Sequence, residues 1–132
     1  MKKTFEIKNR KPFNLTLGDR GEMAGAAYLT RSGYRLLETN YRCALGEIDV
    51  VAERAGRLVF IEIKTRKDHD FGAPEEAVHA AKQRKLVQLA QCYLKERKCK
   101  ERPVSFDVLA LTWDLPGEPR FRLIPDAFGI PD

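Results

Sequence analysis

The segment that decides the fold runs from Gly46 to Arg66 and reads GEIDVVAERAGRLVFIEIKTR. Apolar and polar residues alternate along it in two runs separated by Ala55-Gly56, which predicts two half-buried strands joined by a tight turn. The apolar face carries Ile48, Val50 and Ala52 on the first strand and Val59, Ile61 and Ile63 on the second. The opposite face carries the acidic residues.

The register of this hairpin follows from the requirement that the two apolar faces coincide. A two-residue turn pairs Arg54 with Arg57, and Asp49 is then expected opposite Glu62, with Glu47 opposite Lys64. A four-residue turn gives the same pairing, whereas a three-residue turn with a bulge breaks it.

Two carboxylates that face each other across a strand pair destabilise it unless something balances their charge. A hard divalent cation, Mg²⁺ or Mn²⁺, supplies that balance, with Asp49 and Glu62 as ligands. Lys64 then supports phosphodiester hydrolysis as the ammonium that orients water or steadies developing charge. Glu22 joins the cluster if its helix packs beside the hairpin. An exposed polar face with an ordinary Glu47–Lys64 ion pair explains the same pattern, and both interpretations stay open.

The remaining elements follow from periodicity and capping signals. They are a helix over 19–32 capped by Asp19 and ended by Gly33, strands over 34–42, 45–54 and 57–66, a helix from Pro74 to Arg97-Lys98 with Glu75 and Glu76 in its first turn, a strand over 103–113, a turn at Pro116-Gly117 and a short strand over 121–124. This order, α-β-β-β-α-β-β, predicts an α/β fold with a mixed sheet of about five strands flanked by helices.

The size of the chain, 132 residues, fits one domain, which we expect over 18–132 behind a basic arm at 1–17. The net charge of +5 favours a polyanionic partner. No segment approaches the length of a membrane span and no signal-peptide core is present, so a cytoplasmic protein is expected. The three cysteines, Cys43, Cys92 and Cys99, have no metal or redox spacing and are interpreted as reduced thiols.

The motif residues resemble a known family. Gly46-Glu47-Ile48-Asp49 followed by Phe60-Ile61-Glu62-Ile63-Lys64-Thr65-Arg66 is similar to the split D…(D/E)-x-K signature of the restriction-endonuclease-like superfamily, and the fuller match is to its YraN-like family of uncharacterised bacterial proteins. The resemblance extends over residues 18–128. It also includes Gly21-Glu22, Asn40-Tyr41-Arg42, Phe71-Gly72-Ala73-Pro74, Glu76-Ala77-Val78, Lys82-Gln83-Arg84-Lys85, Tyr93-Leu94, Phe106-Asp107-Val108 and Ala127-Phe128.

This resemblance implies a nuclease-like α/β core similar to that of Holliday-junction resolvases, acting on DNA, branched DNA included. It implies that Glu22, Asp49, Glu62 and Lys64 occupy the active-site positions. The chain departs from the family pattern at Gly25, where alanine is usual, and at Ser105, where arginine commonly precedes Phe-Asp-Val. The first departure weakens the helix and the second removes a possible phosphate contact.

Several other residues are candidates for binding. The basic residues expected to contact nucleic acid are Arg42, Arg66, Lys67, Lys82, Arg84 and Lys85. His69 and His79 lack a third residue at zinc spacing and are interpreted as surface histidines. Stacking on bases is an alternative for Phe60 and Phe71, but core packing is the commoner role of aromatic residues. The competing interpretation of the whole chain is a nucleic-acid-binding module with a nuclease-like fold and no turnover. A homodimer is neither indicated nor excluded.

Overall fold

The computed structural model describes residues 15–67, 79–113 and 117–129. The elements are α1 (Leu17–Arg31), β1 (Arg35–Cys43), β2 (Gly46–Arg54), β3 (Arg57–Arg66), α2 (Ala80–Glu96), β4 (Val104–Thr112) and β5 (Arg120–Phe128). This is the predicted α-β-β-β-α-β-β order. Most of the predicted basic arm, His69, Phe71, the expected helix start at Pro74 and the proline of the Pro116-Gly117 turn lie outside the described residues.

The strands form one five-stranded sheet in the order β1-β2-β3-β4-β5. β3 and β4 are parallel because α2 carries the chain back between them, and the other neighbours are antiparallel. The predicted register of β2 on β3 is confirmed from Arg54↔Arg57 to Val50↔Ile61. Its turn uses positive φ at both Ala55 (51°) and Gly56 (77°), as a two-residue hairpin turn requires.

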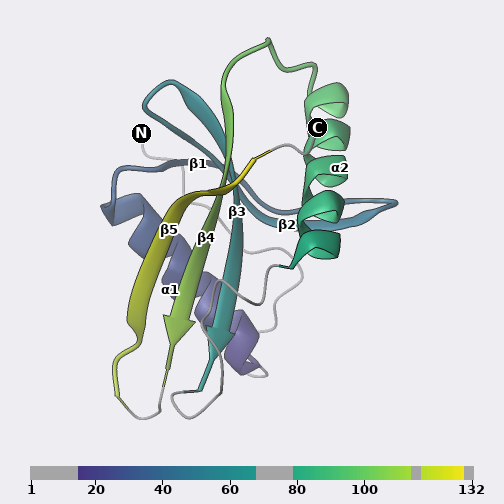
Figure 1. Cartoon of the computed structure of the whole chain (residues 1–132). Coiled ribbons are helices and arrows are strands. Elements are labelled where there is room, and N and C mark those ends of the chain that lie inside the picture. The colour runs from purple at the N-terminus through teal and green to yellow at the C-terminus, as the bar shows by residue number, and fades with distance from the viewer. Residues whose placement is uncertain (1–14, 68–78, 114–116, 130–132) are drawn as a thin grey trace.

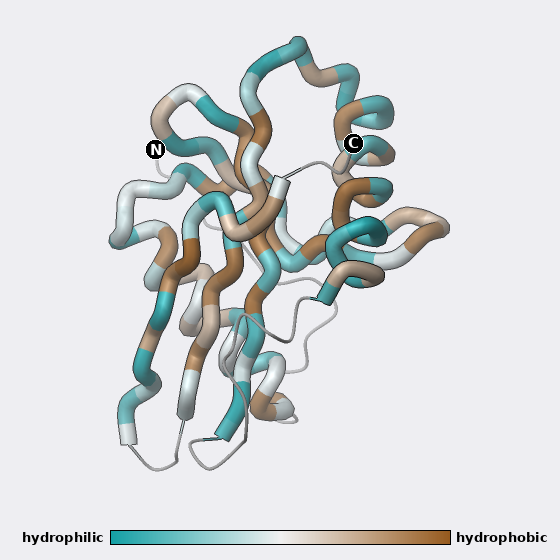
Figure 2. The backbone as a smooth tube through the Cα atoms, in the orientation of Figure 1, coloured by the Kyte–Doolittle hydropathy of each residue, from teal (hydrophilic) through white to brown (hydrophobic). Residues whose placement is uncertain are grey.

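The two helices cover opposite faces of the sheet (Figure 1). Figure 2 shows the hydrophobic residues concentrated along the central strands. The core on the α1 side contains Leu29, Tyr34, Leu36, Val50, Ala52, Val59, Ile61, Ile63, Leu109 and Leu111. The core on the α2 side contains Tyr41, Ile48, Val51, Leu58, Phe60, Leu86, Val87, Leu89, Ala90, Tyr93, Phe106 and Val108. Each helix therefore fixes its side chains against one face of the same sheet.

The prediction that Ile48 and Val50 lie on the same face of the sheet is wrong. Ile48 packs on the α2 side and Val50 on the α1 side, although residues two apart in a regular strand share a face. The change of face falls at Asp49, next to the point where β1 is itself distorted by Asn40, whose φ is 53°. The strand is therefore irregular at the residue that the sequence singled out for chemistry.

Three element ends also differ from expectation. Asp19 is not the N-cap of α1: Thr16 is, and Asp19 bonds back to it in a capping box. α2 begins at Ala80 with His79 as its extended N-cap, so the predicted long helix is not continuous through residue 79. β5 continues to Phe128 past Pro125, because an edge strand tolerates proline and because a register shift opposite Phe106 accommodates it.

A buried polar network lies near the β2–β3 turn. The hydroxyl of Tyr34 donates to the buried carboxylate of Asp107 at 2.7 Å and accepts from Arg54 at 3.3 Å. The backbone N–H of Asp126 donates to the other Asp107 oxygen at 2.9 Å. Ser105, buried beside it, donates to the same oxygen at 3.4 Å. Burial and the Asp107 hydrogen bond raise the pKa of Tyr34 to about 12.

Candidate metal centre

The helix that carries Glu22 lies unusually close to β3. A Cβ on Gly21 would stand 1.8 Å from the Oγ1 of Thr65, and one on Gly25 would stand 3.0 Å from the Cδ1 of Ile63. At position 21 only glycine permits that separation, whereas at Gly25 the side chain of Ile63 would have to shift by a few tenths of an ångström. The close approach brings Glu22 to the sheet.

β2 and β3 separate at one end of their shared ladder. Their pairing ends at Val50↔Ile61, so Asp49 and Glu62 are not a ladder pair, contrary to the expected register beyond that point. Instead the Oδ2 of Asp49 accepts a hydrogen bond of 2.8 Å from the backbone N–H of Ile63. The carboxylate thus takes the place of a strand partner at the fork between β2 and β3.

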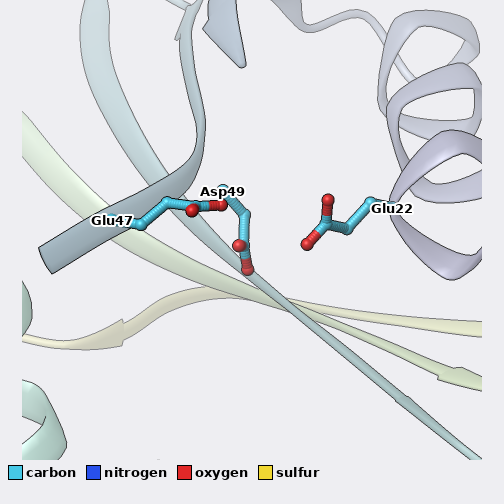
Figure 3. A group of neighbouring side chains, drawn as sticks. All are labelled: Glu22, Glu47 and Asp49. Atoms are coloured by element: carbon cyan, nitrogen blue, oxygen red, sulfur yellow. The ribbon is translucent and has the colours of Figure 1, made fainter. Parts of the chain in front are cut away.

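Three carboxylates meet at this fork. Glu22 from α1 and Glu47 and Asp49 from β2 each offer an oxygen, and these oxygens all lie within 4.8 Å of one another. Figure 3 shows Glu22 reaching from its helix toward Asp49. The expected association of Glu22 with Asp49 is thereby realised. The sequence places Glu47 opposite Lys64 and does not indicate it as a metal ligand.

The position of Asp49 at the fork disfavours the ionised form of its carboxyl group. Burial raises the pKa of its carboxyl well above the usual range, and the neighbouring charge of Glu62 raises it further, with smaller contributions from Glu22 and Glu47. The hydrogen bond from Ile63 opposes this by stabilising the charged form. Concentrated negative charge of this kind favours a bound cation.

Glu62 lies close enough to perturb Asp49 but has a partner of its own. Its side chain is 8% exposed, and one of its oxygens lies 3.2 Å from the Nζ of Lys82 in the first turn of α2. The structure therefore brings Lys82, expected to contact nucleic acid, into an ion pair with a predicted active-site carboxylate.

Glu47 is held by two residues of β1. Its Oε1 accepts a hydrogen bond of 2.8 Å from the amide of Asn40, and its Oε2 accepts one of 2.9 Å from Arg42. The same amide donates to Glu22 at 3.2 Å. The expected Glu47–Lys64 pairing is wrong, because the ladder that would place them opposite ends before it reaches them.

Sequence reasoning missed Asn40 as a functional residue. The available signal was an asparagine inside a run of strand-forming residues, where asparagine is disfavoured unless the backbone turns left-handed. In the structure Asn40 has a φ of 53° and is 7% exposed. Its role at the fork depends on contacts across strands, which local sequence does not reveal.

The other basic candidates lie on β3, directly after it, and on α2. Lys64 is half-buried on β3, and Arg66 and Lys67 follow at the end of that strand. Lys85 lies one turn beyond Lys82, with its Cε 3.5 Å from where a Cβ on Gly46 would stand. Arg84 is exposed elsewhere on α2.

His79 and Phe60 have structural roles. His79 caps α2 by accepting from the N–H of Lys82 at 3.4 Å. Phe60 is buried, stacked on Phe106 and edge-on to Tyr93, which confirms its expected place in the core.

The element order and the mixed five-stranded sheet define an α/β protein with the fold that the restriction-endonuclease-like resemblance implied. Residues 21–111, which include every residue of the fork, match the model of Uncharacterised protein family UPF0102. The chain belongs to this family, which is the YraN-like family that its motifs indicated.

Similar proteins share most of their length with this chain. A UPF0102 protein of Symbiobacterium thermophilum is 46% identical over 112 residues, 85% of this chain and 95% of its own. One of Moorella thermoacetica is 50% identical over 97 residues, 74% of this chain and 81% of its own. One of Syntrophus aciditrophicus is 41% identical over 117 residues, 89% and 91% of the two chains. Within the described residues, neither helix is long and apolar enough to cross a membrane.

Proposed function

We propose that this protein is a metal-dependent endonuclease that hydrolyses phosphodiester bonds in DNA, branched DNA included. The observation that carries the proposal is the convergence of Glu22, Glu47 and Asp49 at the β2–β3 fork, with Glu62 beside them. Arg42 pairs with Glu47 and Lys82 pairs with Glu62. Carboxylates in this number at one point are the ligands that a hard divalent cation prefers.

The residues present fit such a cation. Three carboxylate oxygens lie within 4.8 Å of one another, and a buried amide oxygen, the Oδ1 of Asn40, stands beside them without a hydrogen-bond donor. Mg²⁺ or Mn²⁺ held by Glu22, Glu47 and Asp49 would polarise a phosphoryl oxygen and lower the pKa of water. Glu62 is the fourth candidate ligand once Lys82 leaves it.

The chain's own groups would carry the remaining steps. Lys64, two residues beyond Glu62, is the ammonium that would orient the attacking water or steady the charge developing on the phosphate. Arg42, Arg66, Lys67, Lys82, Arg84 and Lys85 would hold the nucleic-acid backbone by contacts to its phosphates. The net charge of +5 has the sign that such contacts need.

The proposal is tested by a cleavage panel. Branched, flapped, single-stranded and duplex DNA, with RNA controls, are incubated with the protein in Mg²⁺, in Mn²⁺ and in EDTA. We expect cleavage of at least one DNA substrate that requires the cation. Lys64→Ala should abolish most of it without changing the thermal melt, while Lys95→Ala, at the exposed far end of α2, should cut like wild type.

One observation favours a second function, a nucleic-acid-binding module without turnover. Lys82 neutralises Glu62, so one of the predicted active-site carboxylates already has a cationic partner. Binding of the panel in EDTA with no cleavage in either metal, and no effect of Lys64→Ala, would establish this alternative and end the enzyme proposal.

A further inference from the structure

Asn40 contacts two of the three clustered carboxylates. Its Nδ2 donates to the Oε1 of Glu47 at 2.8 Å and to the Oε2 of Glu22 at 3.2 Å. The amide group therefore lies between acids from two different elements, β2 and α1. Its partially positive NH₂ group balances both charges at the place where a cation would balance them better.

The other end of the same amide has no partner. The Oδ1 of Asn40 is buried and accepts no hydrogen bond, although the residue is only 7% exposed. Buried amide oxygens are ordinarily paired, so an orphaned one calls for an explanation. An amide oxygen is also a hard oxygen donor, of the kind that divalent cations accept from asparagine.

We propose that Asn40 is itself a ligand of the divalent cation, and that Glu22, Asn40, Glu47 and Asp49 together form its site. The inference rests on the proposed metal dependence. A cation at the fork takes over the negative charge of Glu22 and Glu47, and this releases the NH₂ group. Rotation of the amide by half a turn about its terminal bond then exchanges Nδ2 for Oδ1, because the two ends have nearly the same size.

The backbone explains why an asparagine can occupy this position. Asn40 has a φ of 53°, a left-handed conformation that asparagine, aspartate and glycine adopt with the least strain. Glycine at this position would keep the backbone and remove the amide. Aspartate would keep an oxygen and remove the donor.

Glu47 belongs to the site for a related reason. Its two oxygens are fixed by Asn40 and Arg42, so its carboxylate is oriented before any cation arrives. Outer contacts of this kind commonly change metal affinity by about 10–100-fold when they are removed. Arg42 is therefore a positioning residue at this site, through the Glu47 carboxylate.

The test is Mn²⁺ binding to the full chain, measured by calorimetry and by the electron paramagnetic resonance of free Mn²⁺. We expect Asn40→Gly to bind Mn²⁺ about tenfold or more weakly than wild type while remaining folded. Asn40→Asp should bind at least as tightly as wild type, yet melt at a lower temperature without metal, because a further carboxylate then faces Glu22 and Glu47. Glu47→Gln should also weaken binding. Glu53→Gln, at the other end of β2, should not.

A second measurement separates a ligand from a residue that only positions the acids. In metal-free protein the side-chain NH₂ signals of Asn40 should appear downfield in nuclear magnetic resonance, because both protons face carboxylates. Addition of Mg²⁺ should move them upfield as those bonds break.

Unchanged amide signals, or wild-type Mn²⁺ affinity in Asn40→Gly, would overturn the inference while leaving the proposed metal dependence intact. Wild-type protein that binds no Mn²⁺ would overturn both. Binding that follows the expected pattern without cleavage of any substrate would support this inference and contradict the nuclease proposal alone.

Discussion

The ammonium of Lys82 on α2 lies 3.2 Å from a carboxylate oxygen of Glu62 on β3. The side chain of Lys82 is 37% exposed and that of Glu62 is 8% exposed. The lysine is therefore in contact with water, while the glutamate is nearly buried. The pair links the start of α2 to the sheet next to the fork. A cation that approaches Glu62 competes with this lysine, and a phosphate that approaches Lys82 competes with Glu62.

The first prediction concerns that competition. Lys82→Met should lower the free energy of unfolding in EDTA by about 1–2 kcal/mol, because Glu62 loses its partner in a mostly buried place. The Mg²⁺-induced rise in melting temperature should be larger in the variant than in wild type. Thermal melts in EDTA and Mg²⁺ measure both quantities, with Lys85→Met as the control one turn further along α2. Equal Mg²⁺ shifts in wild type and Lys82→Met would show that Glu62 does not participate in cation binding.

The second prediction concerns the crowded charge of Asp49. Its raised pKa means that ionised Asp49 destabilises the metal-free fold, so Asp49→Asn should be as stable as wild type or more stable at pH 7 in EDTA. The asparagine oxygen can still accept the Ile63 hydrogen bond. With Mg²⁺ the order should reverse, since wild type gains more stability from a bound cation than a variant that has lost a charged ligand. If Mg²⁺ shifts both melts equally, Asp49 is not a ligand.

The third prediction concerns the close approach of α1 to β3. Gly21→Ala places a Cβ against Thr65 and should lower the free energy of unfolding by about 1–3 kcal/mol. Gly18→Ala meets nothing closer than 3.7 Å and should leave stability unchanged or raise it by up to about 1 kcal/mol. Urea titrations of both variants make the comparison. A stable Gly21→Ala protein would mean that α1 lies further from the sheet.

The fourth prediction concerns nucleic-acid binding. In EDTA, binding should weaken steeply with salt because phosphate contacts release counterions. Arg84→Ala and Lys85→Ala should each reduce the slope of log affinity against log salt by about one. Lys95→Ala serves as the control at the other end of α2. Unchanged slopes in both variants would place the binding surface away from the start of this helix.

The fifth prediction uses the buried tyrosine near the β2–β3 turn. The pKa of Tyr34 is raised from 10.0 to about 12, so the folded state favours the neutral phenol. Its contribution is present below pH 10 and is lost as the pH rises toward 12, and this loss amounts to about 2–3 kcal/mol. Tyr34→Phe should therefore show a weaker decline in stability between pH 10 and 12. Parallel urea titrations across that range supply the measurement, and identical declines would contradict the network.

Sequence patterning predicted the sheet well where the strands are regular. The hairpin register from Arg54↔Arg57 to Val50↔Ile61 follows from matching apolar faces across a two-residue turn. The parallel pairing of β3 with β4 follows from the helix between them. These features depend on residues close together in sequence or on the period of a strand.

The site was harder to predict because it lies where that regularity ends. The alternation of apolar and polar residues predicts that backbone pairing continues through Asp49 and Glu62. In the structure the pairing stops before them, and the Asp49 side chain accepts the hydrogen bond of the Ile63 N–H. The partners of Glu47 come from β1 and the partner of Glu62 comes from α2, and no spacing in the chain indicates either contact. Motif residues were therefore identifiable, but their partners required the tertiary structure.

The hydrogen bond from the Ile63 N–H to Asp49 makes this amide proton sensitive to a cation at the fork. Elsewhere in β3 an amide proton is shielded by a neighbouring backbone, but at Ile63 it is shielded by a side chain that a cation would recruit. Deuterium exchange at this single amide is therefore linked to occupancy of the fork, while exchange at Ile61, inside the regular ladder, tracks the opening of the sheet as a whole. Comparing the exchange rates of these two amide protons distinguishes cation binding at the fork from opening of the whole sheet. The comparison needs neither a substrate nor a substitution.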